Sequence, residues 1–187
     1  MKLLLLSLLL FNTATTLLAQ DDTDITTFTV EGNVYTNPFF GFSMNVPEGW
    51  PAAKNKDAAY LAGFSYNLLQ AKQEGNNCVF TAVHAERKSY DPRITTATIA
   101  ADTKEFVEMS YLEVTASTEP ATLTMAGKTF YTFSVEGKFI DDCVKHEDFY
   151  LAEVNGYWLL FVTAHAPGNK AEQATLETAL KTLKFKN

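Results

Sequence analysis

Apolar and polar side chains alternate in several short stretches of the chain after residue 27. Alternation with a period of two is typical of a strand that buries one face, because successive side chains point to opposite sides of a sheet. The stretches that show this pattern, or are rich in β-branched and aromatic residues, are Phe28–Val34, Gly41–Val46, Ser65–Gln73, Cys78–Arg87, Thr129–Phe139, Val144–Val154 and Tyr157–Ala166. We therefore expect a β-sheet to form the larger part of the fold.

Two connections between these strands carry turn signals. Glu74-Gly75-Asn76-Asn77 contains glycine and asparagine, which tolerate the positive φ that a tight loop needs. Asn155-Gly156 is the strongest short-range signal for a two-residue hairpin. Both turns predict antiparallel neighbours, so the sheet is expected to be mostly antiparallel.

Two other stretches change to the helical period of about 3.6 residues. The first runs from Thr96 to Leu112, and the face expected to be buried comprises Ile99, Thr103, Phe106, Val107 and Ser110. The second follows Asn169, which can cap a helix together with Glu172 three residues later. Its expected buried stripe comprises Leu176, Ala179, Leu180 and Leu183. Because no long linker interrupts the pattern, the sequence predicts a single α+β domain.

The first twenty residues have the features of a secretory signal peptide. Lys2 supplies a basic start, and Leu3–Phe11 supplies an apolar run. A membrane anchor is the alternative, but crossing a bilayer takes about 20 apolar residues, and polar residues interrupt this run much earlier. We expect residues 1–20 to be cleaved, 21–27 to form a disordered tail, and the domain of 28–187 to be secreted or periplasmic without a membrane span.

The charge of the chain bears on its partners. The formal net charge is −7, and removal of Lys2 with the leader makes it one unit more negative. The acidic residues are scattered and no cluster of lysine and arginine interrupts them. The negatively charged phosphates of nucleic acid repel a protein of net negative charge. We therefore expect no nucleic-acid partner and consider instead a protein or a small apolar ligand.

The chain has two cysteines, Cys78 and Cys143. An even number of cysteines in an oxidising compartment favours a disulfide between them. Two separate buried thiols are the alternative, since free cysteine behaves as a small apolar residue. No Cys-x-x-Cys spacing suggests redox catalysis or a zinc site.

The segment Asn37–Trp50 reads Asn-Pro-Phe-Phe-Gly-Phe-Ser-Met-Asn-Val-Pro-Glu-Gly-Trp. It resembles the opening of the PsbP-like superfamily, in which a Gly-aromatic-Ser strand ends in Pro-x-Gly-Trp. The later order of a hairpin, a helix, three antiparallel strands and a closing helix is similar as well, over Phe28 to Lys186. The resemblance implies an α/β/α sandwich around a central, mostly antiparallel sheet.

The superfamily includes an extrinsic photosystem II subunit, a Ran-binding nuclear import factor and many exported bacterial proteins. Most members bind other macromolecules and do not catalyse, which the resemblance implies for this chain too. No position here matches a functional residue of the photosystem or Ran-binding branches, so no residue role is carried over. A shared fold does not by itself establish a function.

Motifs of known catalytic sites are missing from the sequence. Gly41–Asn45 and Gly63–Asn67 each lack the second glycine of a nucleophile elbow, which argues against a serine hydrolase. There is no His-Glu-x-x-His motif, no glycine-rich phosphate loop and no EF-hand loop. We therefore expect no catalytic residues and no cofactor.

One group of residues could carry chemistry if the Asn-Gly hairpin is regular. Counting outward from that turn places His146 opposite His165 and Asp148 opposite Thr163. Opposed Cβ atoms lie about 5 Å apart, so the two imidazoles could share a metal ion or a proton. Asp148, diagonal to His165, could serve as a third ligand or as an orienting partner. A bulge in either strand would send the histidines to opposite faces. A chance meeting of two surface histidines is the alternative interpretation.

An aromatic-rich stretch includes Phe39, Phe40 and Trp50. Large aromatic side chains usually fill a core, but they are also favoured in grooves that bind a polypeptide or an apolar ligand. We predict first an exported, non-catalytic binding or accessory module that recognises a protein or an apolar ligand. The alternative prediction is a metal-dependent or hydrolytic enzyme whose site is built around the histidines.

Overall fold

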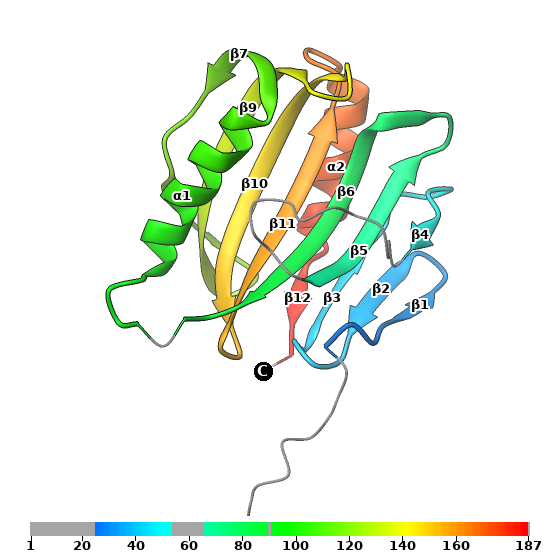
Figure 1. Ribbon diagram of the computed structural model, residues 1–187. Helices are drawn as coiled ribbons and strands as arrows, with labels where there is room; N and C mark the ends of the chain where they lie inside the picture. Colours follow the sequence, from blue (N-terminus) through cyan, green and yellow to red (C-terminus); the bar gives the residue numbers. More distant parts are fainter. Residues whose placement is uncertain (1–24, 54–65, 90, 187) are drawn as a thin grey trace, which may run out of the picture.

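The computed structural model describes residues 25–53, 66–89 and 91–186 (Figure 1). The predicted leader, residues 1–20, lies outside the described part of the chain. The strands of the described residues are β1 (Thr29–Glu31), β2 (Val34–Asn37), β3 (Phe42–Asn45), β4 (Ala52–Ala53), β5 (Tyr66–Gln73), β6 (Asn76–Arg87), β7 (Tyr111–Ser117), β8 (Ala121–Met125), β9 (Lys128–Phe139), β10 (Val144–Val154), β11 (Tyr157–His165) and β12 (Lys184–Phe185). The helices are α1 (Thr96–Met109) and α2 (Lys170–Lys181). No helix among these residues is long and apolar enough to cross a membrane.

The strands form two antiparallel sheets. The larger has the order β4-β5-β6-β11-β10-β9-β7, with β8 also paired to β9, and the smaller has the order β1-β2-β3-β12. Helix α1 lies across one face of the larger sheet, whereas α2 and the smaller sheet lie on the other (Figure 1). The predicted α+β fold with a central antiparallel sheet and helices on both faces is therefore confirmed.

Each face of the larger sheet has its own apolar core. On the α2 face, Phe42 and Met44 of the smaller sheet share a buried cluster with Phe161 of β11. On the α1 face, Val107 shares a second cluster with Phe149 of β10. Because side chains alternate along a strand, the even-numbered residues of β10 face α2 and the odd-numbered residues face α1.

Several predicted boundaries were wrong for identifiable reasons. Phe28–Val34 is not one strand, because Gly32, at a φ of 62°, turns the chain between β1 and β2. The predicted tail also ends earlier than residue 27, since buried Asn37 donates a hydrogen bond to the Ile25 carbonyl at 2.8 Å. Strands β7 and β8 were missed because nearly all their side chains are exposed, so burial imposes no alternation on them.

The first helix also differs from its prediction. It ends at Met109, and its buried residues are Ala100, Thr103 and Val107. Phe106, expected to be buried, is 46% exposed, because the helix is rotated so that smaller side chains face the sheet. The second helix buries Leu176, Ala179 and Leu180 as predicted, and the Asn169 side chain accepts a hydrogen bond from the Glu172 amide at 3.3 Å.

The predicted disulfide is confirmed: Cys78 and Cys143 are bonded, with their Cα atoms 5.5 Å apart. Cys78 lies near the start of β6, and Cys143 immediately precedes β10. Between these two strands runs β11, which ends at His165. The disulfide therefore joins β6 to β10 next to the point where β11 stops.

The turn between β10 and β11 leads to a testable prediction. Asn155 and Gly156 have φ values of 52° and 76°, and, apart from Gly156 and its two chain neighbours, no described residue has an atom within 4 Å of a Cβ placed on Gly156. We expect Gly156→Val to lower the free energy of unfolding by about 1–2 kcal/mol, because a β-branched residue resists the left-handed conformation. Urea denaturation measures the loss, and Gly156→Asn, which tolerates that conformation, should lose less. Equal stability of wild type and Gly156→Val would contradict the assigned turn.

Candidate metal centre

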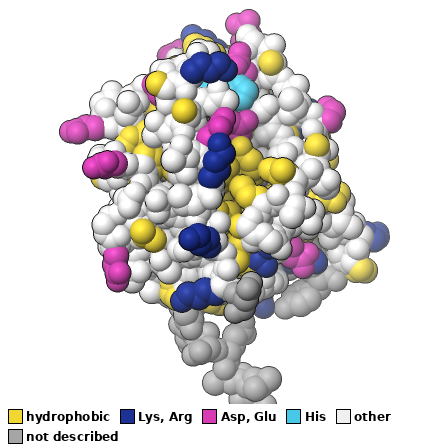
Figure 2. Space-filling view, turned by 180° about the vertical axis from the view of Figure 1, so that it is seen from behind, with side chains coloured by type: hydrophobic (Ala, Val, Ile, Leu, Met, Phe, Trp, Pro, Cys, Tyr) yellow, Lys and Arg dark blue, Asp and Glu magenta, His cyan; other side chains and the backbone are white. Residues whose placement is uncertain are grey.

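A polar row crosses the α2 face of the larger sheet near its end. The β10–β11 register is regular from Val154↔Tyr157 to His146↔His165, so no bulge separates the histidines. On the other side of β10, His146 is paired with Glu136 of β9. Figure 2 shows a histidine side chain beside acidic side chains on this face of the molecule. The structure thus brings His146, His165 and Asp148 to one place, as the hairpin count predicts.

The two imidazole rings stack against each other. Their centroids are 5.0 Å apart and their planes differ by 23°. One potential ligand atom from each of His146, Asp148 and His165 lies within 4.8 Å of the other two. A tetrahedral zinc ion with bonds of 2.0–2.2 Å places its ligand atoms about 3.3 Å apart, so small side-chain rotations would close the site.

The burial and the hydrogen bond of the His165 ring are those expected of a metal ligand. Its side chain is nearly fully buried, with 4% of the residue exposed, and its Nδ1 lies 2.9 Å from the Ala166 carbonyl oxygen. Because that oxygen can only accept, Nδ1 donates and the neutral ring keeps its lone pair on Nε2. No group in the described part of the chain bonds to this buried Nε2. Metal-binding histidines typically have this arrangement, with one ring nitrogen donating to a carbonyl.

His146 lies between two carboxylates. Its Nδ1 is 3.0 Å from Glu136 Oε2, and its Nε2 is 3.2 Å from Asp148 Oδ1. The hydrogen bond to Asp148, with a further contribution from Glu136, raises the pKa of His146 above its usual value despite the opposing effect of burial. With a metal ion bound, Asp148 and His146 Nε2 would both turn to the ion, and Glu136 would continue to orient the ring through Nδ1.

The donor set fits a divalent transition-metal ion. Two imidazole nitrogens and one carboxylate suit zinc and its neighbours, whereas calcium and magnesium prefer oxygen ligands alone. The carboxylates of Asp148 and Glu136 would offset the charge of a divalent ion. Three protein ligands leave a fourth position for water or another donor.

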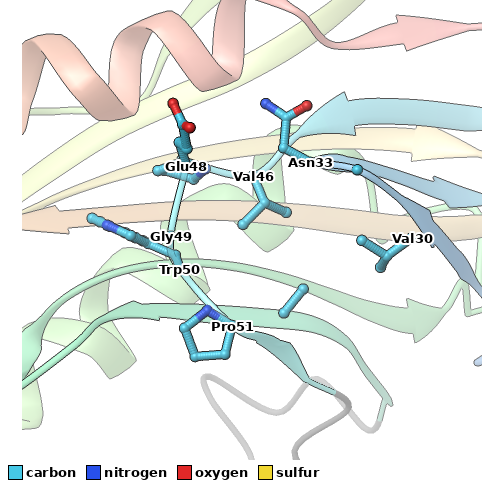
Figure 3. Close-up of a pocket in the computed structure, with 10 residues that line it drawn as sticks. Val30, Asn33, Val46, Glu48, Gly49, Trp50 and Pro51 are labelled. Atoms are coloured by element: carbon cyan, nitrogen blue, oxygen red, sulfur yellow. The ribbon is translucent and has the colours of Figure 1, made fainter.

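The predicted aromatic site is placed differently. Phe40 is 3% exposed and belongs to the core, and Phe39 packs against it with ring centroids 4.8 Å apart. Burial of Phe40 removes it from the expected binding surface. Trp50 does line a pocket of about 660 Å³ between the β1–β2 turn and β4. Val30, Val46 and Pro51 form part of the wall of this pocket, and Glu48 lies above it (Figure 3).

A buried polar group lies beneath the histidines on the α1 face of β10. The Lys145 Nζ is 3.1 Å from Glu147 Oε1, and the Tyr111 hydroxyl donates to Glu147 Oε2 at 2.5 Å. Lys145 and Glu147 are 3% and 2% exposed. Burial, followed by the nearby Glu147 carboxylate, raises the pKa of Tyr111. Sequence reasoning missed this group, although two charged residues on the apolar side of an alternating strand were a visible signal.

The third histidine, His84, is separate from the site. It belongs to β6 and is 5% exposed. Burial lowers the pKa of His84 to about 4, so its ring is neutral near pH 7. Its partner on β11 is Leu160, which belongs to the core of the α1 face, opposite the face that carries His146 and His165.

Comparison with known proteins supports the fold. No protein-family model matches the chain, and no curated protein matches it. Among solved structures, it is similar to cyanobacterial PsbP (CyanoP) from Synechocystis sp. PCC 6803, with a TM-score of 0.56, 13% identity, and coverage of 84% of this chain and 95% of that one. It is also similar to LpqN of Mycobacterium tuberculosis, with a TM-score of 0.50, 9% identity, and coverage of 78% and 83%. The chain therefore has a PsbP-like fold, as its Gly-Phe-Ser and Pro-Glu-Gly-Trp segments suggest.

Proposed function

We propose that this protein is an exported, non-catalytic binding module whose ligand is a divalent transition-metal ion, with zinc as the best match. His165 Nε2, His146 Nε2 and an Asp148 oxygen would bind the ion. The observation that carries the proposal is the buried Nε2 of His165, which has no hydrogen-bond partner among the described residues and whose lone pair is directed by the Nδ1 bond to Ala166. A buried polar atom without a partner is costly, so it calls for an explanation such as a bound ion.

The same geometry favours binding over hydrolysis. A zinc hydrolase needs a base beside the metal-bound water in addition to the ligands. Here both carboxylates of the cluster, Glu136 and Asp148, are bonded to His146, and neither is left over as a base. The leader-like residues 1–20 support export, and the fold neighbour LpqN is described as involved in cell envelope biogenesis.

Zinc titration of the histidine NMR signals tests the proposal. We expect the signals of His146 and His165 to shift together and saturate at one zinc ion per chain, because both rings bind the same ion. The buried His84 is an internal control whose signal should stay in place. Independent shifts of His146 and His165, or no shift at all, would contradict the proposal.

The loss of zinc affinity in a variant should depend on the role of the residue that is replaced. Replacing the ligand in His165→Gln should weaken zinc binding by about 100-fold or more, and Glu136→Gln, which alters only the group that orients His146, by about 10–100-fold. A competition titration against a chromophoric chelator measures both affinities. Thr163→Val is the matched control, because Thr163 lies opposite Asp148 but offers a poorer ligand. Equal losses in all three variants would argue against direct coordination.

A second candidate ligand is a small apolar molecule in the Trp50 pocket. The pocket volume of about 660 Å³ falls in the range of ligand-binding pockets. The other tryptophan, Trp158, is 3% exposed, so a neutral apolar quencher should affect mainly Trp50 fluorescence. If the pocket is a binding site, Trp50→Ala should abolish saturable binding of a neutral apolar fluorophore. Unchanged binding to this variant would dismiss the pocket.

A further inference from the structure

We propose that the Cys78–Cys143 disulfide holds the metal site together and that its reduction releases the metal ion. This inference rests on the proposed metal-binding function. It assigns a regulatory role to a bond that would otherwise serve stability alone.

The first argument is the position of the bond. Where β11 ends, the final residue pair between β10 and β11 is His146↔His165, and the final pair between β11 and β6 is Phe80↔Ala164. Val144 and Lys145, the first residues of β10, therefore have no partner on β11. The disulfide spans this gap, three residues before His146, and connects the start of β10 directly to β6. The two histidines therefore face each other at the end of the hairpin that the disulfide closes.

The second argument is a force that favours opening of the same segment. Lys145, adjacent to His146, is 3% exposed, and its Nζ lies 5.2 Å from the centroid of the Phe80 ring on β6. Burial of Lys145 and Glu147 costs solvation, which their mutual contact offsets only in part. Once the covalent link is broken, hydration of Lys145 favours separation of the β10 start from β6. This movement would draw His146 away from His165.

The reaction itself is a thiol–disulfide exchange. A dithiol reductant attacks one sulfur of the bond, and the mixed disulfide is then resolved by the second thiol of the reductant. The protein gains two electrons and two protons and ends with two thiols, while the reductant becomes a disulfide. In an oxidising compartment the bond stays intact, and the site keeps its metal.

Zinc affinity of three forms of the protein tests the proposal. We expect the Cys78→Ala/Cys143→Ala variant, which has no thiols that could bind zinc themselves, to bind at least tenfold more weakly than the oxidised wild type. Adding Lys145→Met and Glu147→Gln to that variant should restore most of the affinity, because the buried charges that favour opening are gone. Equal affinities of the oxidised wild type and the double alanine variant would overturn the proposal.

A metal-free measurement separates this proposal from the proposed function. Hydrogen exchange at the His146 and Glu147 amides should be at least tenfold faster after reduction of the wild-type protein with a phosphine, while amides in the middle of β11, such as Leu160, stay protected. Absence of zinc binding by the oxidised protein would disprove the metal-binding function, yet the exchange rates would still decide whether the disulfide closes this end. Unchanged exchange at His146 would overturn the inference.

Discussion

Replacing both cysteines by alanine is expected to lower the free energy of unfolding by about 4 kcal/mol, the value that the chain-entropy model gives for a loop of 65 residues. The disulfide limits the conformations of the unfolded chain, and this loop includes α1 and the strands from β7 to β9. Removal of the bond leaves most native contacts in place. We therefore expect a large loss of stability with the secondary structure retained under native conditions.

Urea denaturation of the Cys78→Ala/Cys143→Ala variant measures this loss, and far-UV circular dichroism checks the secondary structure. The reduced wild-type protein is the matched control, because it keeps both sulfur atoms and loses only the bond. Similar losses in the two forms would attribute the effect to the covalent link. A loss below about 1 kcal/mol in both would contradict the expected contribution of a loop of this length.

Lys145→Met is expected to have an effect of similar size, about 3–5 kcal/mol of unfolding free energy. The substitution keeps the volume of the side chain but leaves the Glu147 carboxylate buried with only the Tyr111 hydroxyl as a partner among the described residues. An uncompensated buried charge costs far more than the net contribution of the intact pair. Chemical denaturation near pH 7 measures the loss.

The double variant Lys145→Met/Glu147→Gln is the control for this prediction. It removes both charges together while an amide oxygen can still accept the Tyr111 hydrogen bond. We expect it to cost much less than Lys145→Met alone, because no buried charge remains without a partner. If the single and double variants lose the same stability, the packing of the Lys145 chain between Phe139 and Phe80 accounts for the effect.

The long strands of the larger sheet could be predicted because burial on alternate sides leaves a pattern. Val144–Val154 has the predicted bounds, and the predicted start of β11 at Tyr157 is also correct. Asn155-Gly156 fixed the register, since a two-residue turn allows only one pairing of the flanking residues. The same register places His146 opposite His165.

Exposed elements could not be predicted in this way. Strands β7 and β8 present nearly all their side chains to solvent, so nothing in their sequence selects alternating polarity. Their pairing with β9 is decided by the free edge of that strand. The rotation of α1 likewise depends on the sheet that it covers: the helical pattern placed Phe106 on the buried face, whereas the structure buries Ala100 and leaves Phe106 46% exposed.

For the candidate site, the amino-acid sequence by itself determined which side chains meet: the period of two and the Asn-Gly turn place His146, Asp148 and His165 together. Only the tertiary structure decided what each can do there. The carbonyl of Ala166 directs the His165 lone pair to Nε2, Glu136 arrives from β9 to orient His146, and the disulfide closes the end of the hairpin. These partners come from segments with no local relation to the hairpin, and their directions depend on how the chain packs around it.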